Sequence, residues 1–349
     1  MLANLISSEL LWTVLISSIP VLLVIAFATP LGEALDIIDK PDTVRKHHAS
    51  PTPMVGGLAF FLAFIANLVF WQWTGGDGLG VGLPLTLSAT IFFVVGLLDD
   101  RHHMRASLRL LILGVVAIAM CFTAPSLVID ELHFQSLGFS IPLGVLAIPF
   151  TVFTLLCFQN AANMADGVNG LFLGLTLVWT LLMAPWLHGA FTLYFGFVGF
   201  VALLLLAPNM RGRLFTGDSG TYLVAFLVCM GSISLYNSLD GALPADYMAV
   251  AFLIPVLDMG RMLITRILRG AHPFEADHGH VHHILIKITD HKPMAVAIYL
   301  ALNLIPLLYF VIDGVPLWAL MILQILAYGS VLTYQNQTAV AASETPGSD

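Results

Sequence analysis

The side chains best suited to chemistry lie in five polar segments of an otherwise apolar chain of 349 residues. One segment joins two apolar runs and holds two amides and a carboxylate, Asn160, Asn163 and Asp166. Polar groups beside hydrocarbon are uncommon unless they contact something polar. Gly167 and Gly170 let the backbone turn sharply or approach a ligand closely. The segment predicts either a loop that contacts a ligand or a solvated loop with a capped helix start.

Two further segments place carboxylates at the ends of apolar runs. Asp99 and Asp100 are adjacent, and adjacent carboxylates repel unless a divalent cation or fixed cations lie beside them. The alternative is a solvated loop in which Arg101 and Arg105 are their partners. The sequence GDSGT around Asp218 offers a carboxylate and exposed backbone N–H groups, which suits a metal–phosphate unit. Asp and Ser also cap helices for purely structural reasons.

The remaining two segments are rich in cations and imidazoles. The stretch that starts at Asp39 reads DKPDTVRKHHASPTP, which suits a phosphate-bearing ligand or topological charge near anionic headgroups. The last segment reads PFEADHGHVHH and places four imidazoles in six residues. It lacks cysteine and any standard zinc spacing, so we favour hydrogen bonds to a diphosphate or sugar over a zinc site. Asp258 is expected to form an i,i+3 ion pair with Arg261.

The composition places the chain among polytopic membrane proteins. It is 58% hydrophobic and 10% charged, with a mean hydropathy of +0.92, and no soluble domain can bury that much apolar surface. The three cysteines lie in apolar runs without pairing or metal spacing, and are interpreted as small core residues. No basic residue precedes the first apolar run, so a cleaved signal peptide is not expected. No nucleic-acid partner is expected.

Apolar runs long enough to cross a bilayer predict an all-α membrane protein with about eleven spans. We expect a single transmembrane domain over residues 1–334 and a polar, disordered tail over 335–349. The expected spans cover residues 9–30, 55–73, 80–98, 107–125, 141–159, 168–187, 190–208, 219–236, 246–268, 294–312 and 315–334.

The distribution of charge predicts the orientation. All 13 basic residues fall in or beside the loops after the odd-numbered spans, and ten of the 12 histidines share that face. By the positive-inside rule this face is cytoplasmic, with the N-terminus periplasmic and the C-terminus cytoplasmic. The five polar segments lie on that face, so the active site is expected on cytoplasmic loops.

Taken together, the five segments resemble the polyprenyl-phosphate N-acetylhexosamine-1-phosphate transferase superfamily, glycosyltransferase family 4. The segments that carry the resemblance occur in family order over almost the whole chain: DKPDTVRKHHASPTPMVGG, GLLDD, NAANMADGVNG, GDSGT and PFEADHGHVHH. The final His-x-His-His looks like the branch that uses UDP-GlcNAc to start O-antigen, enterobacterial common antigen or teichoic-acid-type glycans. Two positions depart from the family pattern: Asn169 replaces a second aspartate, and His278 replaces an arginine.

The resemblance implies transfer of N-acetylhexosamine-1-phosphate, most often GlcNAc-1-phosphate, from a UDP-sugar to undecaprenyl phosphate, with UMP as the second product. It implies Mg²⁺, with Mn²⁺ as a substitute, a multi-pass protein of the bacterial inner membrane, and a homodimer. It also implies roles for individual residues. Asp99, Asp100, Asp166 and Asp218 would be catalytic, and Asp218, Asp99 and Asp100 would bind the metal. The substrates would be bound by Lys40, Arg45, Lys46, His47, Asn160, Asn163, His280, His282 and His283.

Two alternatives remain. Within the enzyme class, the alternative is the peptidoglycan transferase that uses UDP-muramoyl-pentapeptide, although that branch typically shows three consecutive histidines and ten spans. Outside that class, an ion-coupled transporter would place ionisable groups near the membrane midplane. In this chain the carboxylates gather at one set of span ends, which favours an enzyme.

Overall fold

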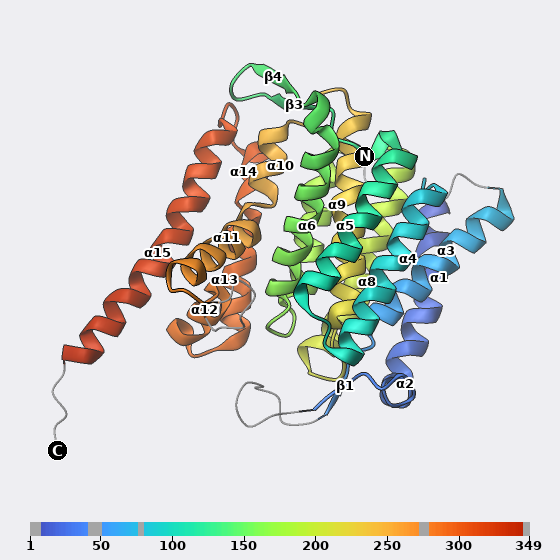
Figure 1. Cartoon of the computed structure of the whole chain (residues 1–349), viewed down its shortest axis with the longest axis horizontal. Coiled ribbons are helices and arrows are strands. Elements are labelled where there is room, and N and C mark those ends of the chain that lie inside the picture. The colour runs from blue at the N-terminus through green and yellow to red at the C-terminus, as the bar shows by residue number, and fades with distance from the viewer. Residues whose placement is uncertain (1–7, 41–50, 76–79, 272–278, 345–349) are drawn as a thin grey trace. The chain divides into compact units, whose positions relative to one another are not determined.

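The computed structural model describes residues 8–40, 51–75, 80–271 and 279–344, with side chains up to residue 334. The described chain is helical apart from two small two-stranded sheets (Figure 1). It divides into two compact units, residues 1–133 with 140–243 and residues 134–139 with 244–349.

Within the residues that the structure describes, the first unit contains nine α-helices. They are α1 (Ser8–Ala26), α2 (Ala28–Leu35), α3 (Gly56–Thr74), α4 (Leu83–His102), α5 (Ala106–Thr123), α6 (Ala147–Ala165), α7 (Leu171–Met183), α8 (Ala190–Met210) and α9 (Gly217–Ser238). Strand β1 (Ile38–Asp39) pairs antiparallel with β2 (Thr52–Pro53). Strands β3 (Glu131–Phe134) and β4 (Phe139–Pro142) form the other sheet.

The described part of the second unit contains six α-helices. They are α10 (Ala245–Ala251), α11 (Leu253–Leu268), α12 (Val281–Thr289), α13 (Lys292–Leu304), α14 (Leu308–Val311) and α15 (Leu317–Glu344). Helices α10 and α11 meet at a bend of 68°. Helix α15 continues to Glu344, past the start of the expected tail at residue 335, and the disorder of that tail stays a prediction.

Nine helical segments in the described part of the chain are long and apolar enough to cross a membrane, or up to ten if the bent pair α10–α11 counts as one span. The sixth expected span is a shorter apolar helix, Leu171–Trp186, which ends in a 3-10 turn. A multi-pass all-α membrane protein is therefore confirmed, while the count of eleven and the orientation stay predictions.

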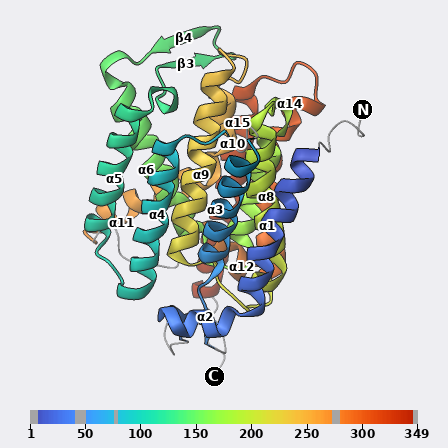
Figure 2. The same ribbon diagram turned by 90° about the vertical axis from the view of Figure 1, so that its right-hand side faces the viewer.

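Helix α9 is the central helix of the first unit. It packs against α3, α4, α6, α7 and α8, and Figure 2 shows it with α3, α4, α6 and α8 around it. Its apolar window is 94% buried, whereas that of α1 is 22% buried. Apolar side chains around the whole circumference of α9 therefore face protein rather than lipid.

Glycines allow α3 and α4 to approach α9 at backbone distance. A Cβ atom at Gly57 would lie 2.3 Å from the backbone nitrogen of Gly220, and one at Gly96 would lie 2.5 Å from the carbonyl oxygen of Asp218. Small residues at helix interfaces in membranes permit such contact. Gly57 thus lets α3, and Gly96 lets α4, pack against the first turn of α9.

We expect Gly96→Ala to lower the free energy of unfolding by about 1–3 kcal/mol, because the new methyl group meets rigid backbone. Gly114→Ala is the matched control on α5, since its Cβ would make an ordinary contact of 3.6 Å with Leu156 and alanine favours helix. Thermal unfolding in detergent compares the two. Equal stability of both variants would contradict this packing.

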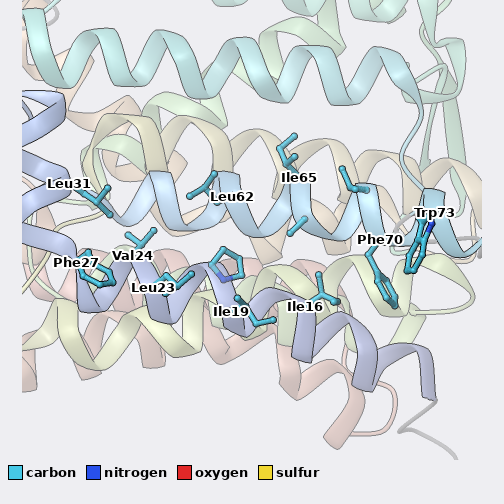
Figure 3. Close-up of a pocket in the computed structure, with 13 residues that line it drawn as sticks. Ile16, Ile19, Leu23, Val24, Phe27, Leu31, Leu62, Ile65, Phe70 and Trp73 are labelled. Atoms are coloured by element: carbon cyan, nitrogen blue, oxygen red, sulfur yellow. The ribbon is translucent and has the colours of Figure 1, made fainter.

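An apolar groove of about 870 Å³ runs along α1, α2 and α3 (Figure 3). Its thirteen lining residues are apolar or aromatic, among them Leu23, Leu62 and Trp73. Large side chains at its margin, including Ile19 and Val69, are more than half exposed. Since α1 and α3 are span-length apolar helices, the groove belongs to the face that meets hydrocarbon.

Candidate active site

The segment before α9 is held in place by backbone hydrogen bonds to the start of α3. The N–H of Phe215 donates to the carbonyl of Pro53 (2.9 Å), and the N–H groups of Gly56 and Gly57 donate to Phe215 and Thr216 (2.9 and 3.0 Å). Side chains at positions 56 and 57 would collide with this segment or the first turn of α9. The GDSGT sequence therefore begins α9 at a fixed position.

Asp100 anchors the N-terminus of α9. Its carboxylate accepts hydrogen bonds from the backbone N–H groups of Asp218 (2.6 Å) and Ser219 (3.0 Å), which satisfies two unpaired donors at a positive helix end. Gly217 has a φ of +72°, and a Cβ there would lie 2.8 Å from the Asp100 carboxylate. The expectation that these two N–H groups are exposed for a ligand was wrong, because Asp100 already binds them.

Asp99 is buried and bound by three other donors. Its carboxylate accepts from Arg109 Nη1 (2.8 Å), the Tyr222 hydroxyl (2.6 Å) and the backbone N–H of Met104 (2.7 Å). The Arg109 guanidinium also lies 5.8 Å from the centre of the Tyr222 ring. The adjacent carboxylates are thus tolerated because each has its own donors, and the proposed partners Arg101 and Arg105 are replaced by Arg109.

Asp218 and Asn163 form the centre of the site. The Thr221 hydroxyl donates to Asn163 Oδ1 (2.9 Å). The NH₂ group of Asn163 is then the part of this amide that can donate, and the Asp218 carboxylate is its neighbour. As a whole residue, Asp218 is only partly buried.

Asp166 follows the last residue of α6 and adds a second carboxylate. Burial, together with the negative charges of Asp218 and Asp100, raises the pKa of Asp166 well above its usual value. The turn that follows ends at Gly170, whose φ is +84° and whose N–H donates to Asn209 Oδ1 (2.6 Å). A cation bound beside these two carboxylates would relieve their mutual repulsion.

The raised pKa of Asp166 predicts a pH dependence of stability. The folded protein binds this proton more tightly than the unfolded chain, so stability is highest below the ordinary carboxyl pKa and falls as pH rises toward the folded value. We expect Asp166→Asn to weaken that fall and to raise the melting temperature at neutral pH in EDTA. Melting curves between pH 4 and pH 8 would contradict this if the variant and wild type kept parallel profiles.

Some predicted substrate-binding residues are not joined to this cluster by the contacts seen. Asn160 lies on α6, one turn before Asn163, and donates to the Leu156 carbonyl (2.7 Å). Lys40 is exposed just after β1. The other three residues of that segment, Arg45, Lys46 and His47, lie outside the described residues.

The second unit holds the three predicted histidines at the start of α12. His280 is the residue before the helix, and His282 and His283 lie in its first turn. The rings of His280 and His282 are stacked with centroids 5.5 Å apart, and those of His282 and His283 are 4.2 Å apart. The expected ion pair of Asp258 with Arg261 is confirmed at 2.8 Å. Asp258 also binds His280 Nδ1 at 2.9 Å.

The donor set of the first unit fits Mg²⁺ better than zinc. Among the described residues, no group of three or more His, Cys, Asp or Glu side chains is arranged to hold a metal ion. Mg²⁺ is usually bound by one or two carboxylates together with substrate phosphates, rather than by a complete protein cage. The neighbouring carboxylates of Asp218 and Asp166 match that pattern, and the metal ligands stay a prediction.

Sequence reasoning did not assign a role to Arg109, Tyr222 or Asn209. Arg109 lies within an expected span, and an ionisable residue there signals a functional or paired group. Tyr222 lies one turn after Asp218 on α9, a spacing that places both on one helix face. Asn209 had no such signal, because its partners, Gly170 and the Leu214 carbonyl, come from loops that only the fold brings together.

Comparison with known proteins gives a consistent result. Residues 82–236 match the glycosyl transferase family 4 model. The undecaprenyl-phosphate alpha-N-acetylglucosaminyl 1-phosphate transferase of Escherichia coli (strain K12) is 27% identical, over 86% of this chain and 84% of that protein. Its namesake in Yersinia pestis is 27% identical over 92% and 89%. The probable undecaprenyl-phosphate N-acetylglucosaminyl 1-phosphate transferase of Bacillus subtilis (strain 168) is 26% identical over 87% and 86%.

The matched residues contain α4, α5 and most of α9, and therefore every contact described for Asp99, Asp100 and Asp218. The similarity to the named transferases extends over most of the chain at modest identity. The chain is therefore similar to glycosyl transferase family 4 over residues 82–236, and to these named transferases over most of its length.

Proposed function

We propose that the protein transfers N-acetylglucosamine-1-phosphate from UDP-GlcNAc to undecaprenyl phosphate, giving the lipid diphosphate sugar and UMP. The observation that carries the proposal is the arrangement at the start of α9. There Asp218 lies near Asn163 and Asp166, at the end of a span-length helix. The names of the relatives supply the acceptor and the sugar.

The two substrates both carry phosphate, so their approach is opposed by charge. Asp218 would hold Mg²⁺, which would supply positive charge that offsets this repulsion. Asn163 would donate to the Asp218 carboxylate, and Asp166 adds negative charge that strengthens cation binding. Asp100 and Asp99 support the site through the protein framework. Asp100 fixes the first turn of α9, and Asp99 is bound by Arg109 and Tyr222.

The acceptor needs little activation. A phosphate monoester has a second pKa near 6, so the lipid phosphate is mostly a dianion at neutral pH. One of its oxygens forms the new bond to the sugar-bearing phosphorus, and the bond from that phosphorus to the oxygen of UMP breaks. A phosphoryl-enzyme trapped with labelled donor in the absence of acceptor would contradict this direct attack.

The remaining groups are assigned by their chemistry. His280, His282 and His283 can bind the donor diphosphate by hydrogen bonding, and Lys40, Arg45, Lys46 and His47 can bind phosphate. The protein would work in the bacterial inner membrane as the first membrane step of a cell-surface glycan, as a homodimer. Mn²⁺ would serve as a substitute for Mg²⁺.

The test is turnover of radiolabelled UDP-GlcNAc with undecaprenyl phosphate and Mg²⁺ by the purified protein. Lipid-linked product and UMP are expected in equal amounts, and EDTA should stop the reaction. Activity with another UDP-sugar alone would correct the donor, and activity only with UDP-muramoyl-pentapeptide would place the protein in the peptidoglycan branch. Inertness of folded protein with every UDP-sugar would refute the reaction class.

A further inference from the structure

Asp258 has more hydrogen-bond donors around it than an ion pair on one helix face requires. It lies on α11 and is 3% exposed. One carboxylate oxygen accepts from Arg261 Nη2 (2.8 Å) and the Tyr328 hydroxyl (2.9 Å), and the other lies 2.9 Å from His280 Nδ1. Both oxygens lie 3.3 Å from the backbone nitrogen of Val281. A buried carboxylate with this many donors stays ionised and fixed.

Asp258 and Arg261 fix the main chain immediately before and after His280. Asp258 binds the N–H of Val281, which follows His280, while Arg261 Nη2 donates to the carbonyl of Gly279, which precedes it (2.5 Å). Arg261 Nε donates to the Tyr328 hydroxyl (2.6 Å), so Arg261 is itself oriented. Neither the ring nor the main chain of His280 can turn without breaking these bonds.

We infer that Asp258 is a positioning residue for His280, an inference that rests on the proposed role of His280 in binding the donor. A carboxylate can only accept a hydrogen bond, so the proton of His280 must be on Nδ1. Nε2 is then the ring nitrogen left to meet the donor phosphates, as an acceptor in the neutral ring and as a donor in the charged one.

Asp258 also orients the other two histidines through α12. His280 is the residue at the N-terminus of this helix, and its side chain does not cap the helix. The Asp258 carboxylate supplies the cap instead, because it accepts from the backbone N–H of Val281. A negative charge at a helix N-terminus is favourable. Because His282 and His283 lie in this first turn, anchoring the turn fixes the direction in which they project.

The variant Asp258→Asn tests the inference through the position of the His280 proton. Arg261 and Tyr328 both donate to the same carboxylate oxygen, so the amide oxygen of asparagine should take that place. Its NH₂ group then faces Nδ1 and donates to it, which forces the proton to Nε2. Nitrogen NMR of ¹⁵N-histidine protein, assigned by His280→Ala, should report Nδ1–H in the wild type and Nε2–H in the variant. An unchanged tautomer would overturn the inference.

A double-mutant cycle tests the consequence for turnover. We expect Asp258→Asn to lower kcat/KM for UDP-GlcNAc by about ten- to a hundredfold, with the KM for undecaprenyl phosphate unchanged. In the His280→Ala background the same substitution should change kcat/KM by less than about threefold, because residues that act as a unit are not additive. Equal losses in both backgrounds would overturn a role through His280.

Asp290→Asn is the matched control, since Asp290 lies at the other end of α12 with a φ of +48°, which asparagine tolerates. Melting temperatures of all variants separate loss of fold from loss of positioning: a fall in kcat/KM explained wholly by unfolded protein would refute the inference. If the wild-type protein transfers no sugar phosphate, the proposed function fails, and the NMR result alone decides whether Asp258 positions His280.

Discussion

Asp218→Asn is expected to lower the rate of sugar-1-phosphate transfer by about a hundred- to a thousandfold. A bound metal ion contributes several kcal/mol of transition-state stabilisation, and each 1.4 kcal/mol is a factor of about ten in rate. Asparagine keeps the size of the side chain and loses the charge that would hold the cation. Initial rates with labelled UDP-GlcNAc over a range of Mg²⁺ concentrations measure the effect.

Two further observations distinguish loss of the cation from loss of the fold. The neutral amide in this variant would relieve the repulsion that Asp218 has with Asp166 and Asp100, so its melting temperature in EDTA should equal or exceed that of the wild type. Added Mg²⁺ should stabilise the wild type more than the variant. Asp130→Asn, at an exposed carboxylate, is the matched control and should keep full activity. Transfer by Asp218→Asn within threefold of wild type would refute a catalytic Asp218.

Arg109→Met is expected to lower the free energy of unfolding by about 3–5 kcal/mol, the cost of leaving a buried carboxylate without its cation. The side chains of Arg109 and Asp99 are 19% and 4% exposed, and they meet at 2.8 Å. Methionine fills much of the same space and cannot donate a hydrogen bond. Unfolding in detergent, by heat or denaturant at a pH above 7, measures the loss.

The double variant Arg109→Met with Asp99→Asn should regain most of the stability, since it removes the uncompensated charge as well as its partner. Arg101→Met is the control: Arg101 and Asp36 are 50% and 83% exposed and lie 3.9 Å apart. Such a surface pair contributes about 0–1 kcal/mol. If Arg109→Met and Arg101→Met had the same free energy of unfolding, burial of the Asp99 carboxylate would not require its ion pair with Arg109.

The sequence by itself determined the class of protein and the residues worth examining. Apolar runs of bilayer length can be recognised without tertiary information, because lipid requires each span to satisfy its own backbone hydrogen bonds. The order of the polar segments pointed to Asp99, Asp100, Asp166 and Asp218, and the structure places all four in one unit near the start of α9.

Element boundaries and short helices were less accessible from the sequence. The expected span 168–187 contains an apolar run long enough to cross a bilayer, yet α7 ends at Met183 and a 3-10 turn follows. Proline at position 185 and the glycine at 189 interrupt regular helix there. Hydropathy reports how apolar a segment is and does not report where its hydrogen-bond pattern changes.

Only the tertiary structure decided what each polar group does. Asp99 and Asp100 are neighbours in sequence, yet one binds Arg109 and Tyr222 while the other caps α9. Asp258 forms the expected ion pair with Arg261 and is also hydrogen-bonded to His280, 22 residues away in the sequence. The reason is physical: a carboxylate's role is set by the donors that packing brings to its two oxygens, and those donors come from helices far apart in the chain.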